Sequence, residues 1–515
     1  MSMSARKEDH KTDELQLAIE TVQDLFSLMQ RARDEGEALH IVEKDIWRSV
    51  LRLGRQALQW FLNQQGTGDM GETVVLEDGR TLRRLEDLHS RSYLSVFGEF
   101  NLPRTVYGTR EGQKIEFVPL DDRLSLPQSK FSYLLQDWDQ MLECEQPYAQ
   151  VSQMLEKILC LKQHVDNLIR MTRHRSEDVE AFRDSLPAPP RAEEGKIVVL
   201  SADGKGVPIR HAADTENIVQ HESKPGPKPD RKKMAIVGAA YTIDPNVRTP
   251  EEIAEDLYRK PGEKRPESVP RPEPCHKRLW ASLTIEPESG GDEDEARHGL
   301  ASVFGWLSSE LETRNPKRKR ETVCIMDGQP SLWEAAALFF NWLVGIVWIL
   351  DLLHVTSRIW QVARLFHPGD DNAARAFVRK NVLQILQGKV LKVLRSWKRR
   401  AEEQNLSPQA RSQLRKISNY LKANHKRMKY DEYLARGYPI ASGVIEGACR
   451  HYVKDRMERA GMNWIVPGAQ AMLDLRSVYL NDQWDEFQQF AIAREIARIH
   501  PHRELVSGTQ FPVAA

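Results

Sequence analysis

Five apolar stretches between residues 196 and 355 constrain the fold of this chain more than any other feature of its sequence. Each stretch is short and is bounded by polar or turn-forming residues, which is typical of buried strands. Helical patterns separate the third stretch from the fourth and the fourth from the fifth. The predicted order is three strands, a helix, a strand, a helix and a strand. The stretches are IVVLSADGKG, MAIVGAAYTI, RLWASLTI, ETVCIMDGQ and GIVWILDLLHV.

This order of elements is that of a ribonuclease H-like core. We therefore expect an α/β protein with a mixed sheet, in which the ends of neighbouring strands converge. Asp203 is expected at the C-terminal tip of the first strand and Asp327 at the tip of the fourth, so that their carboxylates lie side by side. Glu446, in the first turn of a helix that begins near Ser442, would complete the cluster.

Three carboxylates in this arrangement predict a metal centre. Hard divalent cations prefer oxygen ligands, so we expect Mg²⁺ or Mn²⁺, with two ions roughly 3.5 to 4 Å apart. One ion would activate water or a 3′-hydroxyl, and the other would stabilise the leaving oxygen of a phosphodiester. For each Asp-Gly pair taken alone, a turn aspartate is the alternative interpretation.

The charge of the chain is unevenly distributed. In total 74 Lys and Arg balance 74 Asp and Glu, but residues 371–460 carry 21 basic and 8 acidic side chains. The pattern from Gln361 to about Ala435 is helical throughout, which predicts a basic helical bundle inserted into the core. Such a surface either binds a polyanion such as nucleic acid or is a solvated helical face.

The chain before residue 191 shows other patterns. Residues 14–63 have helical periodicity, and residues 73–118 have short alternating runs that predict a small β module. Residues 131–184 are again helical and contain a pair of segments with the length of a helix-turn-helix motif or of two ordinary packed helices. The predicted regions are 1–125 (helices and β module), 126–190 (possible helix-turn-helix), 191–360 (first part of the core), 361–435 (basic helical insertion) and 436–515 (core completion and C-terminal helices).

Several classes of protein are not supported. The five cysteines lack CxxC spacing, which argues against a disulfide framework or a cysteine zinc site and favours a reducing compartment. The charged N-terminal segment does not resemble a signal peptide, and the apolar run 335–350 is too short to span a membrane. The chain has neither a Walker nor a GxSxG motif. We expect a soluble, cytoplasmic protein without a membrane partner.

Several blocks resemble those of bacterial DDE insertion-sequence transposases of the ISKra family. The resemblance covers residues from about 196 to 480, and SYLSVFGEFNLPRTVYG resembles the front end of the same family. The blocks are VVLSADGKGVPIR, KPGPKPDRKKMAIVGAAYTI, CIMDGQPSLW, WILDLLHV and YPIASGVIEGACRHYVKDRMERAGMNW.

The resemblance implies DNA transposition by metal-dependent cleavage and strand transfer. It implies that Asp203, Asp327 and Glu446 are the catalytic acids. Asp351 and His354 are similar to the acid-x-x-His pair of mutator-like relatives, in which the histidine positions a phosphate or orients a carboxylate. The alternative for this pair is a structural one at a strand end, and Asp351 is also a rival third metal ligand. The implied partners are the double-stranded DNA of transposon ends and targets, and further copies of the chain assembled on DNA in the bacterial nucleoid.

Five side chains near the predicted acids are candidates for contacts with DNA. Arg450, Lys454 and Arg456 follow Glu446 at near-helical spacing, so that at least two could face the same DNA backbone, and the alternative is a solvated helix surface. Trp464 could stack on an unpaired base or lie in the core. Lys205 follows Asp203 in the first strand.

Two other functions share these features. One is a nuclease on the same core, which would cut DNA without joining it. The other is a catalytically inactive, DNA-binding regulator derived from a transposase. The presence of all three acids with full-length flanking blocks favours an active transposase.

Overall fold

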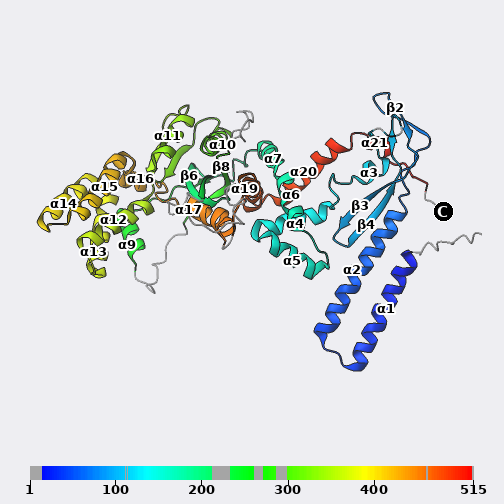
Figure 1. Ribbon diagram of the computed structural model, residues 1–515. Coiled ribbons are helices and arrows are strands. Elements are labelled where there is room, and N and C mark those ends of the chain that lie inside the picture. Colours follow the sequence, from blue (N-terminus) through cyan, green and yellow to red (C-terminus); the bar gives the residue numbers. More distant parts are fainter. Residues whose placement is uncertain are drawn as a thin grey trace, which may run out of the picture. The chain divides into compact units, whose positions relative to one another are not determined.

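The structure, a computed structural model, describes residues 14–110, 112, 114–210, 232–259, 271–285, 298–459 and 462–512 (Figure 1). The chain divides into two compact units. Unit 1 comprises Met1–Met171 and Trp484–Ala515, and unit 2 comprises Thr172–Gln483. Most of the basic block KPGPKPDRKK lies outside the described residues.

Unit 2 contains a mixed five-stranded sheet. Its order is β10-β9-β6-β7-β8, with β7 antiparallel to both of its neighbours and the other two pairs parallel. The five predicted stretches form these five strands, so the α/β class and the mixed sheet are confirmed. The strands are β6 (Ile197–Pro208), β7 (Lys232–Ile243), β8 (Cys275–Leu283), β9 (Glu321–Met326) and β10 (Val347–Leu350).

Helices cover both faces of this sheet. The side chains of each strand alternate between the two faces, so each face packs against its own helices. One face of β6 packs in a buried cluster with α10 (Gly299–Arg314) and α11 (Pro330–Phe339). The other face, with Ile197 and Val199, belongs to a second cluster formed with helices that follow β10. Burial on both sides explains why this strand is an uninterrupted apolar run in the sequence.

The predicted basic insertion is helical. Its buried side chains share one hydrophobic cluster with Val323 of β9 and Ile349 of β10, so the bundle is continuous with the core on one face of the sheet. Trp397 is 1% exposed in this cluster, and its indole N–H donates to Asn381 Oδ1 at 2.9 Å. The elements are α12 (Leu352–Phe366), α13 (Asp371–Leu386), α14 (Val390–Glu403), α15 (Pro408–Asn424), the 3-10 turn η2 (His425–Arg427) and α16 (Tyr430–Ala435).

Two details differ from the sequence-based prediction. Asp203 lies inside β6, not at its tip, because β6 continues to Pro208 in its pairing with β7. The fifth strand ends at Leu350, and both Asp351 and His354 belong to the start of α12. Asp351 is the N-cap of that helix, since its side chain accepts a hydrogen bond from the Leu353 amide. The fifth strand is therefore shorter than predicted, and the Asp351–His354 pair begins directly after its end.

Short helices complete unit 2. The chain returns from the bundle to the sheet through α17 (Gly443–Ala448), the π-helical segment η3 (Cys449–Lys454) and α18 (Asp455–Met457). Then α19 (Val466–Leu480) packs on β8, where Asn481 Oδ1 accepts a hydrogen bond from the Leu279 amide at 2.8 Å. Two further helices are α7 (Val179–Ser185) and α9 (Pro250–Tyr258).

Unit 1 begins with the helices α1 (Glu14–Glu35) and α2 (Leu39–Asn63), which pack against each other as a hairpin. The small β module follows as predicted, divided between a sheet of order β1-β2-β5 and the antiparallel pair β3-β4. Its strands are β1 (Thr73–Val75), β2 (Thr81–Arg84), β3 (His89–Ser95), β4 (Gly98–Arg104) and β5 (Tyr107–Gly108).

The remaining helices of unit 1 surround this module. The segment considered as a helix-turn-helix forms two helices, with Cys160 between them in the left-handed region at a φ of 56°. Recognition of DNA by this pair stays a prediction. The helices are α3 (Pro119–Leu124), α4 (Tyr133–Glu145), α5 (Tyr148–Leu159), α6 (Val165–Ser176, which crosses into unit 2), α20 (Trp484–Ile499) and α21 (Arg503–Val506). None of the described helices is both long and apolar enough to cross a membrane.

A buried ion pair attaches the C-terminal helices of unit 1 to its middle. His500 Nδ1 lies 2.8 Å from Asp122 Oδ1, and His500 Nε2 lies 2.7 Å from the main-chain oxygen of Leu126. Both partners are acceptors, so both ring nitrogens must carry a proton. Burial by itself lowers the pKa of His500, but these hydrogen bonds outweigh it and the pKa is raised above its ordinary value.

We expect unit 1 to lose stability as the pH rises above about 6.5, the ordinary histidine pKa. A raised folded-state pKa stabilises the protein fully below the unfolded pKa, and this stabilisation is lost as the pH rises through the folded value. His500→Gln should lower the Tm by roughly 4 °C at pH 6 and by less at pH 8. Thermal unfolding followed by circular dichroism between pH 5.5 and 8.5 measures this.

The exposed His40 of α2 gives a matched control. His40→Gln should leave the pH profile of the wild type unchanged. If His500→Gln has the same dependence of Tm on pH as the wild type, the charged state assigned to His500 is wrong.

Candidate active site

The pairing of two parallel strands brings the first two predicted acids together. Ala202 of β6 is paired with Met326 of β9, so the residues that follow them, Asp203 and Asp327, emerge beside each other. Burial raises the pKa of Asp203, and the negative charge of Asp327 raises it further. The sheet therefore holds two carboxylates in mutual repulsion at the end of β9.

Asp203 is held by hydrogen bonds on both carboxylate oxygens. Its Oδ1 accepts from the Gly204 amide at 2.7 Å, and its Oδ2 accepts from the thiol of Cys449 at 3.5 Å. Burial and the nearby charge of Asp203 raise the pKa of the Cys449 thiol. The thiol thus keeps its proton and acts as a donor to the carboxylate.

Asp327 lies in the turn between β9 and α11. Its Oδ1 accepts from the Gln329 amide at 2.8 Å, and its main-chain oxygen accepts from the indole N–H of Trp333 at 2.7 Å. A Cβ at Gly328 would lie 2.2 Å from the ring of Tyr420, so only glycine fits after this aspartate. The second Asp-Gly pair is therefore a turn, and it also carries an acid of the cluster.

Asp351 is a fully buried carboxylate whose oxygens are both used by the protein. Its Oδ1 accepts from the amides of Leu353 and Ser442, each at 3.1 Å, and its Oδ2 lies 2.6 Å from His354 Nδ1. Burial acts to raise the pKa of Asp351, but the hydrogen bonds from His354 and Ser442 outweigh it, and the pKa is lowered. The pKa of His354 shifts in the opposite direction, because the hydrogen bond of His354 to Asp351 raises it.

Glu446 lies in the first turn of α17, as predicted, and faces the same cluster. Its Oε1 is 3.9 Å from His354 Nδ1. Burial and the charges of Asp351 and Asp203 raise the pKa of Glu446. Ligand atoms of Asp351, His354 and Glu446 all lie within 4.8 Å of one another. The predicted glutamate is thus near Asp203, with the Asp351–His354 pair beside both.

The donor set fits a hard divalent cation. No Lys or Arg side chain in the described part of the chain forms an ion pair with Asp203, Asp327 or Glu446, although burial and neighbouring carboxylates disfavour the charges of Asp203 and Glu446. A cation with oxygen ligands relieves this repulsion. Asp351 fits less well as a ligand, because its two oxygens already accept hydrogen bonds from Leu353, Ser442 and His354.

The five predicted DNA contacts fall into two groups. Arg450 and Lys454 are exposed, and Lys205 is half-buried in β6. Arg456 is 1% exposed and Trp464 is 7% exposed, with the guanidinium 5.1 Å from the ring centroid. The indole N–H of Trp464 donates to the main-chain oxygen of Met457. These two side chains are part of the core and cannot reach DNA in this arrangement, so both predictions are corrected. Arg456 follows Lys454 by only two residues, which places it on another side of the helix from Lys454.

Sequence reasoning missed three residues that shape the cluster. Cys449 follows Glu446 by three positions, so helical spacing already placed it on the same side as the glutamate. Ser442 offers its amide to Asp351, and no sequence signal pointed to this contact. Tyr420 contacts Gly328 from α15 within the insertion, and only the fold brings the two together.

Comparison with known proteins adds little to this geometry. No protein-family model matches the chain, and no curated protein matches its sequence. Among solved structures, the Drosophila P element transposase strand transfer complex matches with a TM-score of 0.23 and 9% identity, over 70% of this chain and 81% of that one. A TM-score of this size is too low to carry an argument about the fold or function of this chain.

The two N-cap aspartates of the helical insertion differ in burial, and this difference predicts different costs of removal. Asp351→Ala should lower the free energy of unfolding of unit 2 by about 2 to 3 kcal/mol, because it leaves buried donors without an acceptor. Asp370→Ala, at the exposed N-cap of α13, should cost only about 1 kcal/mol. Urea unfolding followed by circular dichroism measures both, and equal costs would contradict the anchoring role of Asp351.

Proposed function

We propose that this chain is a DDE-type DNA transposase, which cleaves DNA at the ends of a mobile element and joins them to a target. The observation that carries the proposal concerns the neighbours of Asp203: Asp203 and Asp327 follow paired positions of β6 and β9, and the charge of Asp203 acts on Glu446 of α17. Metal-assisted phosphodiester chemistry needs such a set of oxygen ligands.

The topology of the sheet supports a ribonuclease H-like core. In chain order the strands lie 3-2-1-4-5, and only the second runs antiparallel to its neighbours. The two aspartates follow paired positions in the first and fourth strands, and the glutamate comes from a later helix. Open sheets of this kind place their sites where the strand order reverses, here between β6 and β9.

Asp203, Asp327 and Glu446 would hold one or two Mg²⁺ or Mn²⁺ ions, which when bound activate the attacking hydroxyl and stabilise the leaving oxygen. Each other side chain of the cluster has its own task. Cys449 fixes the orientation of the Asp203 carboxylate by donating to its Oδ2. Asp351 holds the imidazole of His354 at 2.6 Å and raises its pKa, which favours the protonated form that can contact a scissile phosphate.

The exposed basic side chains support DNA as the partner. Arg450 and Lys454 lie in the segment that follows Glu446, where both could contact the phosphates of a strand that enters the acid cluster. Duplex DNA carries one negative charge per roughly 1.7 Å, and each contact with Lys or Arg releases counterions. The helices α13 to α15 of unit 2 carry further exposed basic side chains. In a bacterial cell the enzyme would act on the DNA of the nucleoid.

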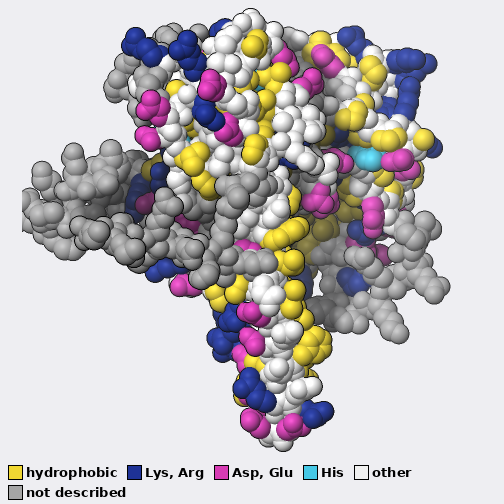
Figure 2. Space-filling view, turned by 90° about the vertical axis from the view of Figure 1, so that its right-hand side faces the viewer, with side chains coloured by type: hydrophobic (Ala, Val, Ile, Leu, Met, Phe, Trp, Pro, Cys, Tyr) yellow, Lys and Arg dark blue, Asp and Glu magenta, His cyan; other side chains and the backbone are white. Residues whose placement is uncertain are grey.

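We further propose that the α1–α2 hairpin joins two copies of the chain. Figure 2 shows hydrophobic side chains in a stripe along this hairpin. On α1 the stripe consists of four exposed residues at spacings of four, three and four, which lie along one side of a helix. They are Leu15 (51% exposed), Ile19 (44%), Val22 (37%) and Phe26 (60%).

The residues that flank this stripe favour a second copy as its occupant. Gln16, Gln23 and Gln30 are exposed and follow the stripe at intervals of seven residues. Two α1 helices packed through their stripes would therefore bring polar but uncharged side chains together, without repulsion between like charges. A two-fold axis lets the same stripe serve both partners.

Substitution of the acids tests the catalytic proposal. Asp203→Asn, Asp327→Asn and Glu446→Gln should each reduce cleavage and joining by at least about 100-fold, since each removes a carboxylate that would hold the metal ions. The assay uses labelled duplexes carrying end repeats from the DNA that flanks the coding sequence, with Mg²⁺ or Mn²⁺. Binding of the duplexes should persist in all three variants.

Asp370→Asn is the matched control, because this exposed carboxylate at the N-cap of α13 lies outside the acid cluster and Asn caps a helix equally well. It should cleave as the wild type does. Cleavage without joining would favour the nuclease, and binding without cleavage under either metal would favour the inactive regulator.

The dimer proposal predicts a change of mass in solution. Wild type should be a dimer without DNA, and a variant with Ile19→Glu and Phe26→Glu should be a monomer, because charges buried in a helix seam are costly. Light scattering after size exclusion measures the mass, and circular dichroism checks that the helices persist. Val344→Glu, at a 93% exposed residue of unit 2, should stay dimeric. A monomeric wild type, or a dimeric double variant, would contradict the proposal.

A further inference from the structure

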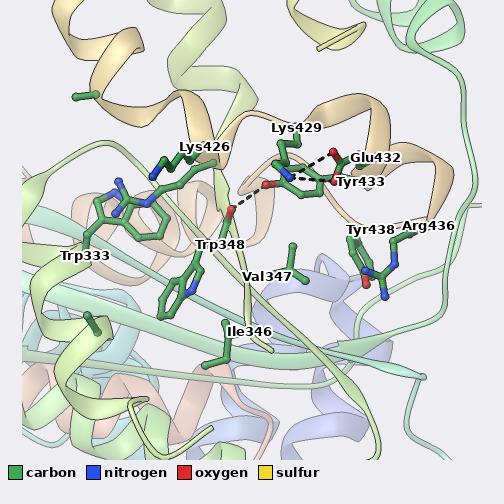
Figure 3. Close-up of a pocket in the computed structure, with 13 residues that line it drawn as sticks. Trp333, Ile346, Val347, Trp348, Lys426, Lys429, Glu432, Tyr433, Arg436 and Tyr438 are labelled. Atoms are coloured by element: carbon green, nitrogen blue, oxygen red, sulfur yellow. Dashed lines mark hydrogen bonds and ion pairs between the residues drawn. The ribbon is translucent and has the colours of Figure 1, made fainter. Parts of the chain in front are cut away.

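Unit 2 contains a cavity of ≈ 580 Å³ beside the edge strand β10. Its walls come from β10, from the helix α11, and from the segment that runs from the end of α15 through η2 and α16 (Figure 3). Cavities of about 300 to 1,000 Å³ hold small organic ligands. The cavity is separate from the carboxylate cluster, since none of Asp203, Asp327, Asp351 or Glu446 lines it.

Aromatic rings form much of the wall. Trp348 of β10 is half-buried and lies between Trp333, at a centroid distance of 6.0 Å, and Phe340, at 6.5 Å. Tyr433 and Tyr438 line the cavity from α16 and the loop after it. A flat ring placed in this cavity would therefore meet aromatic side chains on the strand and on the helix.

The edge of β10 is not free to take another strand. The hydroxyl of Tyr433 donates to the main-chain oxygen of Trp348 at 3.1 Å, and the hydroxyl of Tyr430 donates to that of Leu350 at 2.7 Å. A peptide that extended the sheet would have to displace both tyrosines. This argues against an extended peptide as the occupant of the cavity.

Positive charge surrounds the aromatic wall. Lys429 is paired with Glu432 at 3.3 Å, and Arg436 is paired with Glu321. Lys426 is exposed and Arg427 half-buried, and within the described part of the chain neither makes an ion pair. The Arg427 guanidinium lies 4.2 Å from the ring centroid of Trp333. Two cations without acidic partners thus remain next to the aromatic rings.

We propose that this cavity binds one nucleotide, with its base against Trp348 and its phosphate on Lys426 and Arg427. Aromatic side chains stack on the bases of single strands, and a basic groove holds their backbone. The cavity provides both features, in a volume that suits one nucleotide. Two sources share this chemistry: a free nucleotide, and an unpaired nucleotide of a DNA strand.

The hydrogen-bond network connects the cavity with the acids. Trp333 lines the cavity, and its indole N–H donates to the main-chain oxygen of Asp327 at 2.7 Å. Trp348 precedes Asp351 by three residues, roughly 10 Å along an extended strand. The second source rests on the proposed function: a strand cut at the acid cluster could place an unpaired nucleotide, a few positions from the cut, into the cavity.

Binding measurements on the full-length chain test the proposal. In fluorescence anisotropy with a labelled eight-nucleotide single strand, Trp348→Ala and Lys426→Gln should each weaken binding, by about tenfold for the tryptophan, as expected for the loss of one base stack. Calorimetry with the four deoxynucleoside monophosphates and with ATP and GTP tests the free nucleotides. Metal chelator is present throughout, so that no strand is cut.

Matched controls separate this site from general attraction to DNA and from catalysis. Lys317→Gln, at an exposed lysine in the turn between α10 and β9, should leave binding unchanged. Because chelator prevents cleavage throughout, a failure of the catalytic proposal leaves this result intact. Trp348→Phe keeps an aromatic ring and should restore most of the affinity, which separates stacking from a loss of folding.

Each outcome decides the proposal. If Trp348→Ala and Lys426→Gln weaken binding of the oligonucleotide but not of any free nucleotide, the ligand of the cavity is an unpaired nucleotide of DNA. Weakened binding of a free nucleotide assigns it to that ligand. If Trp348→Ala and Lys426→Gln bind the single strand and every free nucleotide as the wild type does, while both proteins are folded by circular dichroism, the proposal is wrong.

Discussion

The buried carboxylate of Asp351 connects the parts of the chain on which the acid cluster depends. The main-chain amide of Asp351 donates to the main-chain oxygen of Met326, the last residue of β9. The side chain of Asp351 accepts hydrogen bonds from the amides of Leu353 and Ser442. One residue thereby joins the end of β9, the start of α12 and the segment that leads into α17. A buried charge is tolerated only when its hydrogen bonds are made, so this junction has one well-defined geometry. The positions of Asp327 and Glu446 follow from it.

The helical insertion is part of this arrangement because it shares the core of the sheet. Its buried side chains form one cluster with those of β9 and β10, and the hydroxyls of Tyr430 and Tyr433 donate to main-chain oxygens of β10. Tyr420 of the insertion fills the space above Gly328, directly after Asp327. The bundle therefore fixes the entry of α17 and the turn that carries Asp327, although it separates Asp351 from Glu446 in the sequence.

The sequence was sufficient to predict the five strands and their class, and the turn that carries Asp327, because apolar runs and Asp-Gly turns are local signals. It could not predict that β6 continues past Asp203, since that depends on pairing with β7, which comes later in the chain. Nor could it show that Arg456 and Trp464 are buried. The spacing after Glu446 allowed at least two of Arg450, Lys454 and Arg456 to share a face, and Arg456, two residues after Lys454, is the one on another side. Contacts such as that of Ser442 with Asp351 arise only in the folded chain.

The carboxylates of the cluster do not stabilise the folded protein. Burial and mutual repulsion raise the pKa values of Asp203 and Glu446, so each of these groups favours unfolding when it is ionised. His354, with its raised pKa, offsets only part of this negative charge. Three features form a rigid scaffold that holds the repelling groups close to one another. They are the strand pairing, the Cys449 thiol that donates to Asp203, and the hydrogen-bonded Asp351. Such a concentration of disfavoured charge is typical of a functional site, and a divalent cation is the partner that would relieve it.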